Sequence, residues 1–196
     1  MQEFFDLVML PQNLLFYFFA YALAATPTSY LVARFIHGVD VKKEPLKLHS
    51  AFYVWRTMSR KSGVLVFVLD ALKGIIPCAI AHSLLVSPVI IAFIGLFAVI
   101  GHCFSIWLNF SGGRGAATAM GALLFVYWPA SLFGILVFAL LMMVGFGAGR
   151  SSLVGVSVGL GVLFLGVSNK MIWLIVAIMG VIILARHRAF WNDSGK

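Results

Sequence analysis

Long apolar runs separated by short polar breaks dominate the pattern of hydrophobic and polar positions in this 196-residue chain. The runs are about as long as a helix must be to cross the hydrocarbon core of a bilayer, and they are too numerous for a soluble core. We expect two short membrane-spanning segments inside residues 118–147, together with segments at 14–36, 63–85, 88–108, 153–167 and 171–184. The pattern therefore predicts an all-α polytopic membrane protein with about seven transmembrane helices, several of them short.

Two proline positions divide this pattern further. Pro27 interrupts the first apolar run, and Trp128-Pro129 lies in the middle of a stretch that is too long for one helix. Proline is tolerated at the start of a new helix and tryptophan at a membrane interface, so we expect the chain to turn there. The sequence contains no repeat or linker that would separate domains, and we expect a single integral membrane domain over residues 1–196.

The composition agrees with the membrane class. The chain is 62% hydrophobic and 10% charged, with a mean hydropathy of +1.06. Cys78 and Cys103 lie in apolar stretches without the spacing of metal ligands, so we expect no metal site, and nothing indicates a cofactor. Glu3 and Asp6 precede the first run, which is the wrong charge pattern for a cleavable signal peptide, and the run is expected to be retained.

Lysine and arginine residues predict the orientation of the chain, because they are enriched on the cytoplasmic side of membrane proteins. One predicted face carries the residues Lys42, Lys43, Lys47, Arg56, Arg60, Lys61, Arg114, Arg150, Arg186, Arg188 and Lys196. Lys170 lies on the other face with Glu3 and Asp6. We therefore expect the N-terminus outside and the C-terminus in the cytoplasm. The net charge of +8 is attributed to this orientation and to anionic headgroups or substrates, and no nucleic-acid-binding motif is present.

A glycine-rich segment is the first candidate for chemistry. Gly112, Gly113 and Gly115 surround Arg114, and a helix-favouring run follows from residue 116. Backbone N–H groups and a helix N-terminus can both face an anion there, so a phosphate would fit. The alternative interpretation is a tight turn or close helix packing, which is the commoner use of such glycines in membrane proteins.

Charged residues inside the apolar runs form a second group of candidates. Asp70 and Lys73 lie three residues apart on one helix face and can neutralise each other as a structural ion pair. His102 is a candidate base or phosphate donor, with a hydrogen-bonded packing residue as the commoner alternative.

Several motifs together resemble one family. They are Gly-Val-Asp (38–40), Arg56, the segment 63–74 with Asp-Ala-Leu-Lys-Gly, Gly-His with the glycine-rich block (101–121), Ser152-Leu153 and Arg-His-Arg (186–188). Their order and spacing are similar to those of the bacterial acyl-phosphate:glycerol-3-phosphate acyltransferase (PlsY) family. The resemblance implies seven membrane helices in the bacterial inner membrane, with the signature loops facing the cytoplasm. It also implies transfer of an acyl chain from acyl phosphate to the 1-hydroxyl of glycerol 3-phosphate, or to a related anionic lipid precursor.

The resemblance and the chemistry of the residues together predict the site residues. Arg114, His187 and Arg56 are expected to be catalytic, with Arg114 clamping a phosphate and offsetting charge at the attacked carbonyl. The residues expected to bind substrate phosphate are Gly112, Gly113, Arg114, Gly115, Arg188 and Ser50. Acyl phosphate is an activated donor, so positioning of the two substrates can suffice without a Ser-His-Asp triad.

The sequence also departs from the family pattern. The family's first glycine-, serine- and asparagine-rich loop falls on residues 45–48 and 50–53, which are bulky and apolar here, and Arg114 replaces the usual lysine. Ala189-Phe190 stand where the family has Glu-Asn. Three hypotheses remain: an active acyltransferase, an inactive relative that binds lipid or acts as a membrane scaffold subunit, and a small transporter or channel. The second would use the loop 45–55 to bind a protein partner.

Overall fold

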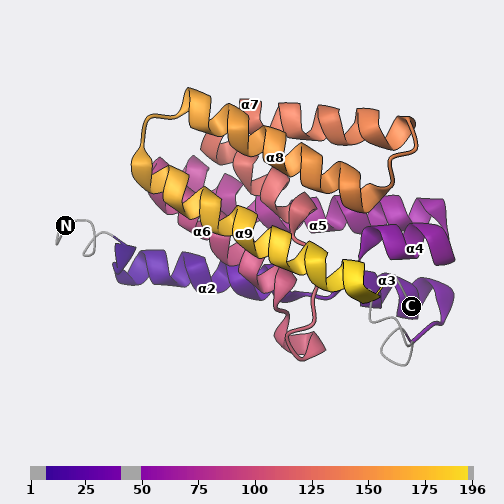
Figure 1. The fold of residues 1–196 in the computed structure, drawn as a ribbon. Coiled ribbons are helices and arrows are strands. Elements are labelled where there is room, and N and C mark those ends of the chain that lie inside the picture. Colours follow the sequence, from indigo (N-terminus) through magenta and orange to yellow (C-terminus); the bar gives the residue numbers. More distant parts are fainter. Residues whose placement is uncertain (1–7, 41–49, 194–196) are drawn as a thin grey trace.

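Every element in the described part of the chain is a helix. A computed structural model describes residues 8–40 and 50–193, with side chains up to residue 188. The elements are α2 (Pro11–Ala25), α3 (Thr28–His37), α4 (Ala51–Thr57), α5 (Arg60–Ser83), α6 (Pro88–Cys103), the 3-10 helix η1 (Ile106–Leu108), α7 (Ala116–Met143), α8 (Ala148–Gly166) and α9 (Lys170–Asp193). The long helices run side by side in one bundle (Figure 1). The predicted all-α class is confirmed.

Local sequence determines several helix ends. α2 ends before Pro27 and α3 begins directly after it, because a proline disfavours helical backbone in the residue that precedes it. Ser87 caps α6 by accepting a hydrogen bond from the Ile90 amide, and Pro88 occupies a first-turn position where its missing N–H has no cost. The predicted interruption at Pro27 is therefore confirmed.

α7 folds back on itself at Tyr127. This residue has the non-helical angles φ −161° and ψ 93°. The Ser131 hydroxyl donates to the Met120 carbonyl at 2.6 Å across 11 residues. A straight helix would separate these residues by about 16 Å, since each residue rises about 1.5 Å. α7 is thus a pair of antiparallel arms, residues 116–126 and 128–143, and the chain turns where Trp128-Pro129 predicts.

Six stretches of the described chain are long and apolar enough to cross a membrane. They are Pro11–His37, Arg60–Ser83, Pro88–Leu108, Ala116–Met143, Ala148–Gly166 and Lys170–Arg188. The fourth contains both arms of α7 and supplies two helical segments. The arrangement agrees with the predicted number of about seven helices.

The two ends of the bundle differ in charge. α2 and α9 begin at the left end in Figure 1, whereas α3 and α9 finish at the right, where α5 and α8 begin. By their positions in these elements, the cations of the right end are Arg34, Arg56, Arg60, Lys61, Arg114, Arg150, Arg186 and Arg188. We call this the basic end. Lys170 begins α9 at the opposite end. Lysine and arginine are therefore concentrated at one end of the bundle, as the prediction of the chain's orientation assumes.

α6 is the central helix. It packs against α2, α5, α7 and α9 and is the most buried of the candidate spans. One core cluster joins it to α7, α8 and α9, and another joins it to α2 and α5. Its last turn, which carries Gly101, His102 and Cys103, is therefore buried near the basic end.

Candidate active site

A cavity of about 370 Å³ lies near the basic end, between α4, α5, α7 and α8. Its polar lining residues come from five segments: Ser50, Asp70, His102, Arg114 and Ser152. Its larger apolar lining residues are Phe52, Trp55, Phe67, Phe138 and Met142. A mostly apolar wall with a few convergent polar groups is typical of small-molecule sites. This cavity can take a ligand that has both an anionic group and an apolar chain.

Arg114 reaches the cavity where α7 begins. Gly115 caps the helix with φ 84°, a left-handed conformation that glycine adopts readily, and it lines the cavity with Ala116 and Ala117. The first N–H groups of a helix have no partner within the helix, and the helix dipole adds positive potential there. Burial lowers the pKa of the Arg114 guanidinium, but arginine begins so high that it stays charged. The site therefore favours an anion.

Gly112 and Gly113 are not among the lining residues of this cavity. The Gly112 amide donates to the Cys103 carbonyl at 3.1 Å, and the Gly113 amide donates to the His102 carbonyl at 3.0 Å. Arg186 in turn donates to the two glycine carbonyls, through Nη2 to Gly112 at 2.6 Å and through Nε to Gly113 at 3.2 Å. Both glycine amides are occupied, so the expectation that they turn toward an anion is not met here. In this segment, Arg114 and Gly115 are the residues that line the cavity.

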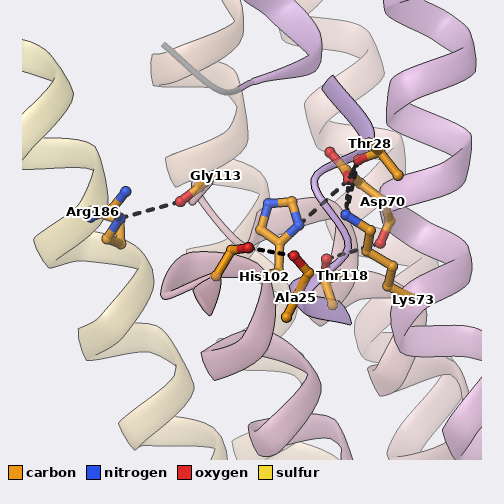
Figure 2. A network of polar contacts seen from close by, with 9 residues as sticks. Ala25, Thr28, Asp70, Lys73, His102, Gly113, Thr118 and Arg186 are labelled. Atoms are coloured by element: carbon orange, nitrogen blue, oxygen red, sulfur yellow. Dashed lines mark hydrogen bonds and ion pairs between the residues drawn. The ribbon is translucent and has the colours of Figure 1, made fainter. Parts of the chain in front are cut away.

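A buried polar cluster reaches the same cavity from α5 (Figure 2). The Asp70 Oδ1 atom accepts hydrogen bonds from Thr28 at 2.5 Å and from Lys73 at 2.9 Å. The His102 Nδ1 atom lies 3.5 Å from the same oxygen. Asp70 and Lys73 are both buried, so each offsets part of the desolvation cost of the other. The expected ion pair is present, and its carboxylate also lines the cavity.

His187 contacts the cavity wall through Ser152. The His187 Nδ1 atom lies 2.8 Å from the Ile183 carbonyl, which can only accept, so Nδ1 carries a proton. The Nε2 atom lies 2.8 Å from the Ser152 hydroxyl, which also lies 3.0 Å from the Gly149 carbonyl. When His187 is neutral, Ser152 donates to it. When His187 is protonated, the histidine donates and the serine hydroxyl turns to Gly149.

The other predicted site residues lie around the cavity. Ser50 lines it and caps α4 by accepting a hydrogen bond from the Tyr53 amide at 3.3 Å. Arg56 is exposed, with its guanidinium carbon 5.8 Å from the centre of the Phe52 ring. Arg188 is also exposed, and neither arginine is among the lining residues. Residues 45–49 of the loop expected to bind a partner lie outside the described residues.

Sequence reasoning missed two polar residues of this region. Ser152 belongs to a matched motif, which was the available signal, but its contact with His187 depends on the packing of α8 near α9. Thr28 follows Pro27 at the start of α3, and nothing in its local sequence indicates that it bonds to Asp70 across 42 residues. Both contacts join helices that are separate in the chain.

Comparison with known proteins places the chain in a family. A family model described as glycerol-3-phosphate acyltransferase matches residues 14–192. The chain belongs to this family. The glycerol-3-phosphate acyltransferase of Prochlorococcus marinus (strain NATL1A) is 32% identical over 181 residues, covering 90% of this chain and 91% of that protein. That of Methylococcus capsulatus (strain ATCC 33009 / NCIMB 11132 / Bath) is 38% identical over 118 residues, covering 60% of each.

Solved structures of a glycerol-3-phosphate acyltransferase have the same fold. The crystal structure of PlsY (YgiH), an integral membrane glycerol 3-phosphate acyltransferase, in its glycerol 3-phosphate form has a TM-score of 0.83 and 31% identity, covering 92% of this chain and 90% of that one. The lysophosphatidic acid form has a TM-score of 0.80 and 32% identity, with the same coverage. The resemblance found in the motifs is confirmed, and the chain is a multi-pass membrane member of this family of phospholipid synthesis.

Proposed function

We propose that this protein transfers an acyl chain from acyl phosphate to glycerol 3-phosphate at the cytoplasmic side of the bacterial inner membrane. The observation that carries the proposal is the cavity that joins Arg114 and the start of α7 to an apolar wall. Both substrates carry a phosphate and one carries an acyl chain. Membership of the glycerol-3-phosphate acyltransferase family supports the acceptor, and the choice of acyl phosphate as donor rests on the motif resemblance.

Arg114 is proposed to bind a substrate phosphate together with the first amides of α7. Guanidinium hydrogen bonds to phosphate are charge-assisted and often bidentate, so they orient the group as well as hold it. The charge of Arg114 also offsets negative charge that develops on the attacked carbonyl oxygen. Ser152 offers a further hydrogen-bonding group at the cavity wall. Its hydroxyl donates to His187 when the histidine is neutral and accepts from His187 when the histidine is protonated.

The remaining predicted residues are assigned supporting roles. Exposed Arg56 and Arg188 raise the positive potential at the basic end, which increases the local concentration of anionic substrates. Ser50 lines the cavity, and its hydroxyl holds the start of α4 in place by accepting from the Tyr53 amide. Gly112 and Gly113 act through Arg186, which they anchor beside the segment that carries Arg114.

The reaction balances without a cofactor. The 1-hydroxyl oxygen of glycerol 3-phosphate forms a bond to the acyl carbon, and the bond from that carbon to the phosphate oxygen breaks. Phosphate leaves with the bonding electron pair, and the hydroxyl proton is released. Acyl phosphate is already activated, so holding the two substrates in an attacking geometry supplies much of the rate.

The decisive experiment is an assay of the purified protein in lipid nanodiscs with palmitoyl phosphate and glycerol 3-phosphate. We expect lysophosphatidic acid and phosphate as products, with no turnover when palmitoyl-coenzyme A replaces the acyl phosphate. Arg114→Ala should lower kcat/KM by roughly 100-fold, as loss of one charge-stabilising donor does in other acyl transfers. Arg114→Lys should keep part of the activity, because it keeps the charge and loses the planar fork.

Lys170→Ala is the matched control, since it removes a cation from the opposite end of the bundle. Full turnover by Arg114→Ala would refute the proposed role of Arg114. Binding of glycerol 3-phosphate without turnover of any acyl donor would instead favour the inactive lipid-binding or scaffold relative.

A further inference from the structure

Arg186, near the end of α9, joins this helix to the glycine-rich segment. Its Nη2 atom donates to the Gly112 carbonyl at 2.6 Å, and its Nε atom donates to the Gly113 carbonyl at 3.2 Å. Figure 2 shows the Arg186 side chain extending from α9 toward the Gly113 carbonyl. A planar guanidinium can hold two successive carbonyls at once, so this contact restrains the direction of the backbone as well as its distance.

The two restrained carbonyls lie directly before Arg114. The Gly113 carbonyl and the Arg114 amide belong to one planar peptide group. A donor on this carbonyl therefore fixes the plane from which the Arg114 side chain leaves the backbone. The next residue, Gly115, has φ 84° and caps the start of α7. Arg114 thus lies between a peptide group held by α9 and the first turn of a long helix.

The opposite face of the same segment is held by α6. The Gly112 and Gly113 amides donate to carbonyls in the last turn of α6. A Cβ on Gly112 would clash with the His102 carbonyl oxygen, so the backbone lies directly against this turn. These peptide groups therefore have α6 on the donor side and Arg186 on the acceptor side. A segment that is held on both faces has little freedom to turn Arg114 away from the cavity.

The backbone before the glycines needs such restraint. Asn109 and Phe110 have φ angles of 50° and 60°, in the left-handed region that L side chains rarely adopt. A backbone of this kind persists only where the surrounding contacts determine it. The Phe110 amide donates to the Ser105 carbonyl at 2.9 Å, which is a contact within the segment itself. Arg186 supplies a contact from a separate helix.

The surroundings of Arg186 agree with a role outside the cavity. Its guanidinium carbon lies 5.6 Å from the centre of the Phe104 ring, within the range of a cation–π contact. Arg186 is not among the described residues that line the cavity, whereas Arg114 is. The next residue of α9, His187, reaches the cavity wall through Ser152. The end of α9 therefore supports the cavity at two places.

We propose that Arg186 is a positioning residue of the acyl transfer, which acts by holding the backbone that carries Arg114. This inference rests on the proposed function. Arg186 sets the direction in which the Arg114 guanidinium enters the cavity. Loss of Arg186 should misplace that guanidinium without removing its charge, so the loss should lower activity only while Arg114 is present.

The test is a double-mutant cycle between Arg186→Met and Arg114→Ala in the nanodisc assay. Methionine keeps an unbranched apolar side chain and removes every donor. In the wild-type background, Arg186→Met should lower kcat/KM by roughly 10- to 100-fold, as a misplacement of about 1 Å can do. In the Arg114→Ala background the same change should lower kcat/KM by less than about twofold, because no guanidinium is left to position.

Arg60→Met is the control, because it removes the same side chain from an exposed position at the same end of the bundle. Its kcat/KM should stay within about twofold of wild type. Arg186→Lys is the second variant, in case Arg186→Met does not fold. Lysine keeps the charge but lacks the fork, so kcat/KM should fall by roughly 3- to 10-fold, about what one hydrogen bond contributes. This loss should also disappear in the Arg114→Ala background.

Two results would overturn this inference. One is a kcat/KM within about twofold of wild type for Arg186→Met, or for Arg186→Lys if only that variant folds. The other is an equal fold loss in the wild-type and Arg114→Ala backgrounds, which would show that Arg186 only stabilises the bundle. Both results require a wild-type protein that turns over. Absence of wild-type turnover would instead refute the proposed function, and this inference would fall with it.

Discussion

Lys73→Met should destabilise the protein more than the double change Asp70→Asn/Lys73→Met. Asp70 and Lys73 are 4% and 5% exposed, and their charged atoms lie 2.9 Å apart. The single change leaves a carboxylate buried within the bundle without its cation. The double change removes both charges and keeps an amide oxygen that Thr28 can still bond. The order of the two stabilities thus reports whether the two residues are partners.

The magnitude follows from the contacts that remain. Removing one partner of a buried ion pair costs about 3–5 kcal/mol. Asp70 keeps Thr28 at 2.5 Å and His102 at 3.5 Å, so we expect the lower value of about 3 kcal/mol. The double change loses roughly one hydrogen bond, or about 1 kcal/mol. For a chain of this size, these values correspond to falls of about 6–12 °C and about 2–4 °C in Tm.

The assay is thermal unfolding of the three variants and wild type in one detergent, with Asp70→Asn alone completing the cycle. The two single losses together should exceed the loss of the double variant by at least about 2 kcal/mol, because Asp70→Asn adds its own cost. Equal losses for Lys73→Met and the double variant would refute the reasoning. Additive losses from the two single changes would refute it as well, because independent sites add.

Two further predictions concern the orientation of the bundle and its packing. Ser83→Cys should react with a membrane-impermeant maleimide on intact cells and Lys61→Cys only after lysis, because the two exposed positions lie at opposite ends and both native cysteines are buried. The reverse labelling would place the basic end outside. Gly155→Ala should cost about 1–3 kcal/mol in unfolding free energy, because its Cβ would lie 2.6 Å from the Gly134 carbonyl oxygen. Gly161→Ala is the control, because a Cβ at Gly161 would meet no atom within 4 Å, and this change should cost nothing. Equal unfolding midpoints for the Gly155→Ala and Gly161→Ala variants would contradict close packing of α7 on α8.

The sequence by itself determined the features that depend on neighbours along the chain. Membrane helices need a local run of apolar residues that satisfy their own backbone hydrogen bonds, so most spans were predictable. Pro27 predicted the break between α2 and α3, and Trp128-Pro129 predicted the reversal at Tyr127. The Asp70–Lys73 pair was predictable because residues three apart share a helix face. The glycine block was correctly placed before a helix, with Arg114 beside it.

Only the tertiary structure decided which of these groups meet. The apolar pattern of a membrane helix does not say which face turns inward, because lipid is as apolar as the bundle interior. Helix rotation therefore depends on close packing between all the neighbours, and the pairing of Ser152 with His187 follows from it. The same packing directs the Gly112 and Gly113 amides to the end of α6 rather than to an anion. It also brings His102 to the cavity beside Asp70, which local sequence could not distinguish from ordinary packing.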